Sequence, residues 1–255
     1  MKNIDAFSWR RVSMVANYYS PRIRRQLMFY PLISLVAFAL GMITYNPGEP
    51  ASGLWVTGLL QYFVIFGPLA LAFHRDWAMS ITLPAGSAEK ATFLAIYSII
   101  VLPVLAMAPC EIALNLVYDR SLFVTDPTMV DPEVAAVLPD AAKQRAQNIL
   151  GLLFSTAVCM WVVMKTRRHV VLKAIGFILL FGLVFGFVVG IMSLFNSGIT
   201  EATASAIRLH SSSAVPPAMK VIMKEMITIS TYLSAAGIIL FVLLTYRAAA
   251  RRELR

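Results

Sequence analysis

One acidic residue, Glu111, lies well inside a long apolar stretch of the sequence. A carboxyl group at membrane depth is costly in free energy and marks a functional site by default. Asn115 follows one helical turn later, and Pro103 and Pro109 precede the carboxyl, so we expect a kinked helix there. Two interpretations stay open. Glu111 and Asn115 belong to a substrate or gating pathway, or Glu111 is a protonated or water-solvated group near the outer interface, hydrogen-bonded to a neighbour.

The sequence lacks the other common signatures of catalysis. It has no GxxxxGK[ST] phosphate-binding loop, no HExxH zinc motif and no GxSxG nucleophile motif. The three histidines, His74, His169 and His210, do not meet at one depth, so we predict no metal site. An intramembrane enzyme that used Glu111 would lack a second catalytic group. We therefore predict no catalytic residue and no cofactor in this chain.

The composition indicates an integral membrane protein. The 255 residues are 59% hydrophobic and 14% charged, and their mean hydropathy is +0.74; soluble domains hold roughly 25% charged residues. The net charge of +9 fits cytoplasmic loops and lipid headgroups, and we predict no nucleic-acid partner. Cys110 and Cys159 fall at different depths, so we expect two unbridged packing residues.

Six apolar segments are long enough to cross a bilayer as helices, which takes about 20 residues at 1.5 Å per residue. Their apolar runs are continuous rather than alternating, which predicts an all-α integral membrane protein. The predicted spans are Gln26–Tyr45, Leu54–Phe73, Ala91–Val117, Gln147–Lys165, Leu172–Phe195 and Ile222–Tyr246. Residues 26–255 would form this six-span domain, preceded by a cytoplasmic interfacial helix in residues 1–25.

Basic residues are unevenly divided between the predicted loops. With the N-terminus in the cytoplasm, sixteen Lys and Arg residues lie on the inner side and six on the outer side. This bias predicts that both termini are cytoplasmic. No small-residue cleavage site follows the first apolar stretch in Met42–Pro50, so we expect that stretch to be an uncleaved signal anchor.

The first 25 residues have the pattern of a basic amphipathic helix lying at the headgroups. At 100° per residue one face is apolar, and we expect Pro21 to end the helix before the basic cluster Arg22–Arg25. The apolar face comprises Ile4, Phe7, Met14, Val15 and Tyr18, and the polar face comprises Arg10, Ser13 and Asn17. An alternative is a simple positive-inside anchor without a mechanical role.

Two long segments separate spans on the outer side. Tyr118–Ala146 holds five spaced acidic residues without EF-hand spacing, which favours a solvated loop over a calcium site. In Asn196–Glu225 we predict two short re-entrant helices, Ile199–His210 and Pro217–Lys224, before the last span. Such helices would dip into the outer membrane surface, where protein or water must cover irregular backbone.

Three glycines recur every fourth residue in the fifth predicted span, at Gly182, Gly186 and Gly190. This spacing clears one helix face and lets another backbone approach closely. We therefore predict helix packing at this row. The partner is either another span of the same chain or a second subunit, and spacing does not distinguish them.

The inner loop His74–Lys90 contains the sequence LPAGSAEK. Pro84 restrains a turn, Gly86 or Ser87 would be the N-cap, and Glu89 would lie in the first turn of the helix that leads into the third span. Earlier in the loop, Arg75, Asp76 and Trp77 are suited to contact headgroups or a docked protein.

This loop resembles the LPxSxxEK signature in the first inner loop of a family of bacterial ABC transporter permeases. Leu83, Pro84, Glu89 and Lys90 match the signature, and Gly86 stands where the family has serine. The N-terminal helix, the six spans and the divided outer segment also resemble exporters of this class. The resemblance implies a bacterial cytoplasmic (inner) membrane protein with a second permease copy or a paralogue, and separate cytoplasmic ATPase subunits that bind ATP and Mg²⁺.

The resemblance also implies a role for the inner loop. ATPase closure would push on the segment Arg75–Lys90 and on the N-terminal helix, and so open a translocation path between permeases. The coupling residues would be Arg75, Asp76, Trp77, Leu83, Pro84, Gly86, Ser87, Glu89 and Lys90. The alternative is a membrane scaffold or regulatory subunit that uses the same loop only for docking. No motif identifies a substrate.

Overall fold

The computed structural model describes residues 7–44, 54–67, 85–124, 139–166, 169–196 and 217–253. Within these ranges every regular element is helical, as predicted. The helices are α1 (Trp9–Thr44), α2 (Leu54–Ile65), α4 (Ser87–Ile96), the π-helical turn η2 (Tyr97–Val101), α5 (Leu102–Tyr118), α7 (Ala141–Lys165), α8 (Val170–Asn196) and α10 (Pro217–Glu253).

Five segments in the described ranges are long and apolar enough to cross a membrane. They coincide with the first, third, fourth, fifth and sixth predicted spans, and the chain is therefore a multi-pass helical membrane protein. The segments are Ile23–Ile43, Ala88–Tyr118, Ala141–Lys165, Leu172–Ile191 and Glu225–Arg251. The second predicted span begins with the apolar helix α2, but its residues 68–73 lie outside the described ranges.

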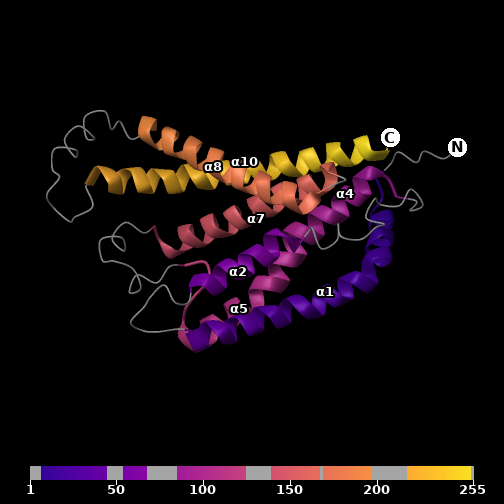
Figure 1. Cartoon of the computed structure of the whole chain (residues 1–255), viewed down its shortest axis with the longest axis horizontal. Coiled ribbons are helices and arrows are strands. Elements are labelled where there is room, and N and C mark those ends of the chain that lie inside the picture. Colours follow the sequence, from indigo (N-terminus) through magenta and orange to yellow (C-terminus); the bar gives the residue numbers. More distant parts are fainter. Residues whose placement is uncertain are drawn as a thin grey trace.

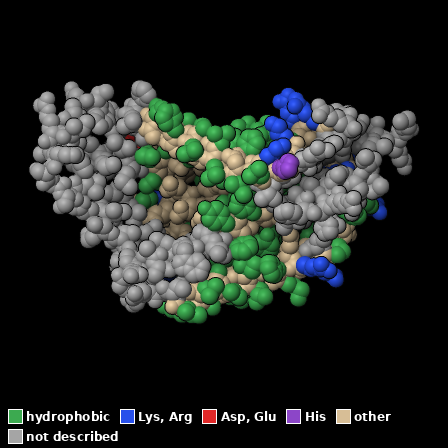
Figure 2. Space-filling model, in the orientation of Figure 1, with side chains coloured by type: hydrophobic (Ala, Val, Ile, Leu, Met, Phe, Trp, Pro, Cys, Tyr) green, Lys and Arg blue, Asp and Glu red, His purple; other side chains and the backbone are tan. Residues whose placement is uncertain are grey.

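The helices form two packed groups (Figure 1). One group pairs α1 with α5, and the other combines α7, α8 and α10, while α2 and α4 lie between them. The N-terminal part of α1, the start of α4 and the C-terminal part of α10 meet at one end of the bundle. In Figure 2 hydrophobic side chains cover the middle of the visible face, and most of the visible Lys and Arg side chains gather toward that same end.

Helix α1 differs from the prediction at Pro21, where the structure continues the helix into the span. The segment before the span is therefore the first part of one bent helix rather than a separate element (Figure 1). Its buried stripe also differs from the predicted face. Val12, Val15 and Tyr19 are buried, and the Tyr19 ring stacks on Phe93 with 5.7 Å between centroids.

The predicted apolar face of this segment is mostly exposed. Among its members with described side chains, Val15 is buried, whereas Phe7, Met14 and Tyr18 are exposed. The physical reason is that both sides of this segment carry apolar residues, and α4 covers the side with Val12 and Val15. The other side stays free for the headgroup region, where aromatic residues are enriched.

The last helix, α10, is longer than the predicted span. Its 37 residues extend about 55 Å at 1.5 Å per residue. The segment Pro217–Lys224 is the first part of this continuous helix rather than a separate re-entrant helix. Pro217 suits the first helical position, where its missing N–H costs no hydrogen bond. The other predicted re-entrant helix, Ile199–His210, lies outside the described residues.

The third span contains the expected disturbance as a π-helical turn. This turn, η2, ends just before Pro103, whose ring would otherwise clash with the carbonyl group four residues earlier. Farther along, the Cys110 N–H donates to Ser34 Oγ of α1 at 3.0 Å. This bond attaches α1 to α5 in the bundle interior. Cys110 and Cys159 are both buried and unbridged, as predicted.

Candidate functional site

The inner-loop motif leads directly into α4. Gly86 is the N-cap residue, with extended backbone angles, and Ser87 is the first residue of the helix. Glu89 lies in the first helical turn, where its negative charge is favourable for the exposed N–H groups. The helix start expected from LPAGSAEK is therefore present, whereas the expected turn at Pro84 lies outside the described residues.

Glu89 is buried, with 2% of its surface exposed, and it contacts the N-terminal helix. Its Oε1 accepts a hydrogen bond from Arg11 Nε at 2.9 Å and lies 2.7 Å from Arg11 Nη2. The same oxygen accepts the backbone N–H of Ser8 at 3.2 Å. Charge-assisted bonds of this kind are stronger than neutral ones, and low solvent exposure strengthens them further. We call this contact the Arg11–Glu89 pair.

Gly86 leaves room for the Glu89 carboxylate. A Cβ atom at position 86 would lie 2.8 Å from Glu89 Oε2, closer than real Cβ contacts allow. A serine there, as in the family signature, would crowd the carboxylate that Arg11 holds in place. A side chain at position 86 would therefore require the Glu89 carboxylate to shift.

The first turns of α4 are also joined to α10. Thr92 Oγ1 donates to the Ala88 carbonyl at 2.8 Å and lies 2.6 Å from the Tyr246 hydroxyl of α10. One turn later, the Tyr97 hydroxyl donates to the side-chain oxygen of Gln26 in α1. The start of the third span is therefore hydrogen-bonded to both α1 and α10.

The predicted coupling residues divide into two sets. Arg75, Asp76, Trp77, Leu83 and Pro84 lie outside the described residues. Gly86 and Ser87 form the helix start, and Glu89 and Lys90 are buried, with 2% and 4% of their surface exposed. The two charges that end the motif are thus internal contacts of the chain. The sequence did not reveal Arg11 as the partner of Glu89, because the two residues lie 78 positions apart in the chain.

Glu111 is half-buried and fully engaged in a local hydrogen-bond network. Its Oε1 accepts the Ser121 hydroxyl at 2.6 Å, and its Oε2 accepts the Leu122 N–H at 2.7 Å. The chain can turn back because Asp119 ends α5 in the left-handed conformation, with φ 52°. Asn115 is exposed. This geometry favours the hydrogen-bonded interpretation of Glu111 over the pathway interpretation.

Glu111→Ala should therefore destabilise the end of the bundle where α5 ends. It leaves the Ser121 hydroxyl and the Leu122 N–H without their acceptor, which costs about 1–3 kcal/mol. Thermal unfolding of the purified protein in detergent measures the loss. Asn115→Ala, an exposed site on the same helix, is the control and should change stability by less than about 0.5 kcal/mol. Equal stability of the two variants would contradict this role of Glu111.

The glycine row of α8 has open space at the positions that side chains would enter. At Gly182, Gly186 and Gly190, no atom lies within 4 Å of the position that a Cβ would take. Among the described residues the structure therefore shows no close packing of another span against the row. The ring contacts of α8 with α7 and α10 are made instead by Phe177 and Phe181. A second subunit as the partner stays a prediction.

Tight glycine contacts lie elsewhere, at Gly67, where a Cβ would lie 2.5 Å from Leu102 Cδ1, and at Gly237 of α10. A Cβ there would lie 2.4 Å from Cε2 of Phe154 in α7. This single glycine stands in no repeating pattern, so spacing in the sequence did not reveal it.

Comparisons of the chain with protein-family models, with curated proteins and with solved structures find no match.

Proposed function

We propose that this chain is the membrane-spanning subunit of an ATP-driven ABC transporter of the exporter type. The observation that supports this most is the Arg11–Glu89 pair, which joins the inner-loop motif to the N-terminal helix. In the proposed mechanism both elements receive the push from the ATPase. A contact between them makes the two elements move together.

The proposed path of force follows hydrogen bonds at one end of the bundle. A push on the inner loop reaches α4, and the Arg11–Glu89 pair passes it to α1. The contact between Thr92 and Tyr246 passes it to α10. Because these helices run the length of the bundle, a displacement at the inner end moves their outer ends as well.

The proposed assembly needs further subunits. A cytoplasmic ATPase binds ATP and Mg²⁺, and a second copy of this chain or a paralogue completes the translocation path. The buried state of Glu89 and Lys90 leaves the preceding part of the segment, residues 74–88, for contact with the ATPase. This burial also suits the second candidate, a non-transporting scaffold, in which the motif only shapes the inner end.

We further propose that the chain lies in a bacterial cytoplasmic membrane with both termini inside. An impermeant thiol reagent should label a cysteine placed at Thr128 or Ser212 from outside, in a background with Cys110 and Cys159 replaced. It should not label one placed at Ser80 or Ala249, because basic loops are retained in the cytoplasm. Labelling at Ala249 from outside would overturn this topology.

The ATPase test separates the transporter from the scaffold. Affinity purification should recover a protein with a P-loop, and the reconstituted complex should hydrolyse ATP faster than that partner alone. Pro84→Gly loosens the turn before α4 and should reduce this stimulation at least fivefold, with normal membrane insertion. Pro132→Gly, in the predicted outer loop, is the matched control. A partner without ATPase activity supports the scaffold, and full stimulation in Pro84→Gly excludes this turn from coupling.

A further inference from the structure

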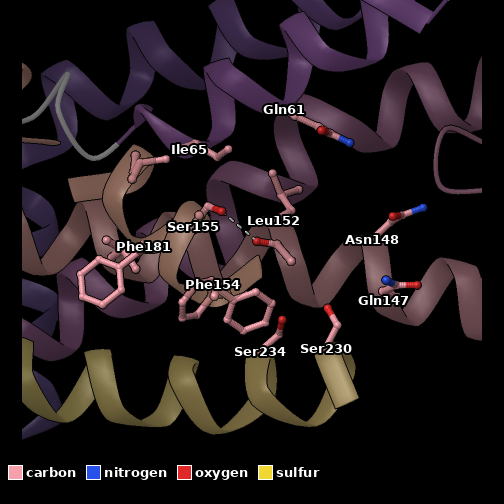
Figure 3. Close-up of a pocket in the computed structure, with 15 residues that line it drawn as sticks. Gln61, Ile65, Gln147, Asn148, Leu152, Phe154, Ser155, Phe181, Ser230 and Ser234 are labelled. Atoms are coloured by element: carbon pink, nitrogen blue, oxygen red, sulfur yellow. Dashed lines mark hydrogen bonds between the residues drawn. The ribbon is translucent and has the colours of Figure 1, made fainter. Parts of the chain in front are cut away.

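A cavity of about 360 Å³ lies inside the bundle, between α2, α7, α8 and α10 (Figure 3). The visible face in Figure 2 is hollowed in the region between α7 and α10, with uncharged polar side chains and backbone exposed in the hollow. Its volume is in the range of pockets that bind small molecules. The cavity lies away from the end with the Arg11–Glu89 pair, and no role in coupling accounts for it.

One part of the cavity wall offers hydrogen-bonding groups from three helices. The polar side chains are Gln61, Gln147, Asn148, Ser155, Ser230 and Ser234. Asn148 already donates to the Phe123 carbonyl at 2.8 Å, and Ser155 donates to the Gly151 carbonyl at 3.0 Å. Within the described ranges, the side chains of Gln61, Gln147 and Ser230 have no hydrogen-bond partner. Their amide and hydroxyl groups can both donate and accept.

The opposite part of the wall is aromatic. Phe154, Phe181 and Phe185 line it, and in Figure 3 the labelled rings of Phe154 and Phe181 lie away from the side chains of Gln61, Gln147 and Asn148. The ring of Phe154 packs against Phe185 at 5.4 Å between centroids. The cavity therefore has a polar part and an apolar part.

No charged side chain is among the described residues that line the cavity. An ion there would lose part of its hydration without gaining a counter-charge, which is unfavourable. An uncharged molecule with a hydrogen-bonding head and an apolar tail matches both parts of the wall. We propose that this cavity binds a small, uncharged amphiphile. Transport of this amphiphile across the membrane rests on the proposed transporter function, whereas binding of the amphiphile in the cavity does not.

The test is photolabelling of the full chain in phosphatidylcholine nanodiscs, without any ATPase. The probe is decanamide with a diazirine on its chain, and mass spectrometry locates the label. We expect labelling within residues 147–158, 178–185 and 230–234, the segments that line the cavity. Unlabelled decanamide should compete at least tenfold better than decyl sulfate or decyltrimethylammonium, which carry permanent charges on the same chain.

Three variants make the result specific to the cavity. Gly182 lines the cavity, and a side chain there meets no atom within 4 Å at its Cβ. Gly182→Leu should fill the space without a clash and reduce labelling at least tenfold. Gly186→Leu, one turn away and outside the lining, should label like the native protein. Gln147→Leu should weaken competition by decanamide about fivefold.

Three results would overturn the proposal. They are unchanged labelling in Gly182→Leu, equal loss in Gly186→Leu, and equal competition by the charged compounds. None of these depends on an ATPase partner, so failure of the transporter assignment leaves the binding result intact. Conversely, ATPase stimulation without cavity labelling would support the transporter and reject this site.

Discussion

Glu89→Ala should lower the free energy of unfolding by about 3 kcal/mol and abolish stimulation of the partner ATPase. The substitution removes the carboxylate that contacts the Arg11 guanidinium, whose side chain is only 22% exposed, and it removes the acceptor of the Ser8 N–H. Loss of one partner of a buried ion pair typically costs about 3–5 kcal/mol, and the partial exposure of Arg11 places this case at the lower end. Thermal unfolding in detergent measures this loss.

A double-mutant cycle isolates the Arg11–Glu89 pair from other effects of each substitution. Arg11→Met and Glu89→Gln remove the charges and keep similar side-chain volumes. Because the two groups are in contact, the double variant should be more stable than the sum of the single effects by at least about 1 kcal/mol. Additive losses would show that the pair contributes nothing through its own interaction.

Glu89→Lys provides the functional measurement. It places a second cation beside Arg11, so the N-terminal helix should separate from the start of α4. We expect normal insertion, because the apolar spans are intact, but loss of stimulated ATP hydrolysis in the reconstituted complex. The charge-swapped double variant Arg11→Glu with Glu89→Arg should recover part of the stimulated ATP hydrolysis. Full stimulation in Glu89→Lys would show that force does not pass through this contact.

Gly237→Leu should destabilise the bundle by about 3 kcal/mol, the upper end of ordinary overpacking costs. Even a Cβ at this position would overlap the ring of Phe154, which packs against Phe241 at 5.8 Å between centroids. The side chain must therefore displace the Phe154 ring or force α7 and α10 apart, and these two helices share the most extensive interface of the described residues. Thermal unfolding and size-exclusion chromatography in detergent follow the change.

Gly176→Leu is the matched control for Gly237→Leu. It makes the same substitution in a helix, but no atom lies within 4 Å of a Cβ at position 176. Its stability should change by less than about 0.5 kcal/mol. If Gly237→Leu were as stable as this control, the close approach of α7 and α10 would not exist.

The class of fold followed from the sequence because the relevant signals are local. Apolar runs of about 20 residues predict spans wherever they occur, and five of the six predicted runs coincide with span-length helices. The helix start at Gly86 and the free cysteines were predicted for the same reason, from nearby residues and their positions along the spans. For Glu111, the sequence left two interpretations open.

The tertiary structure alone decided which faces of the helices meet. Val12 rather than Met14 faces inward in α1, and Gly237 rather than Gly186 is a tight glycine. In a soluble helix the apolar side indicates the core, but lipid is as apolar as the interior, so a membrane helix carries little information about its own rotation. The Arg11–Glu89 pair and the polar cavity depend on that rotation in several helices at once. They therefore emerge only when the whole bundle is assembled.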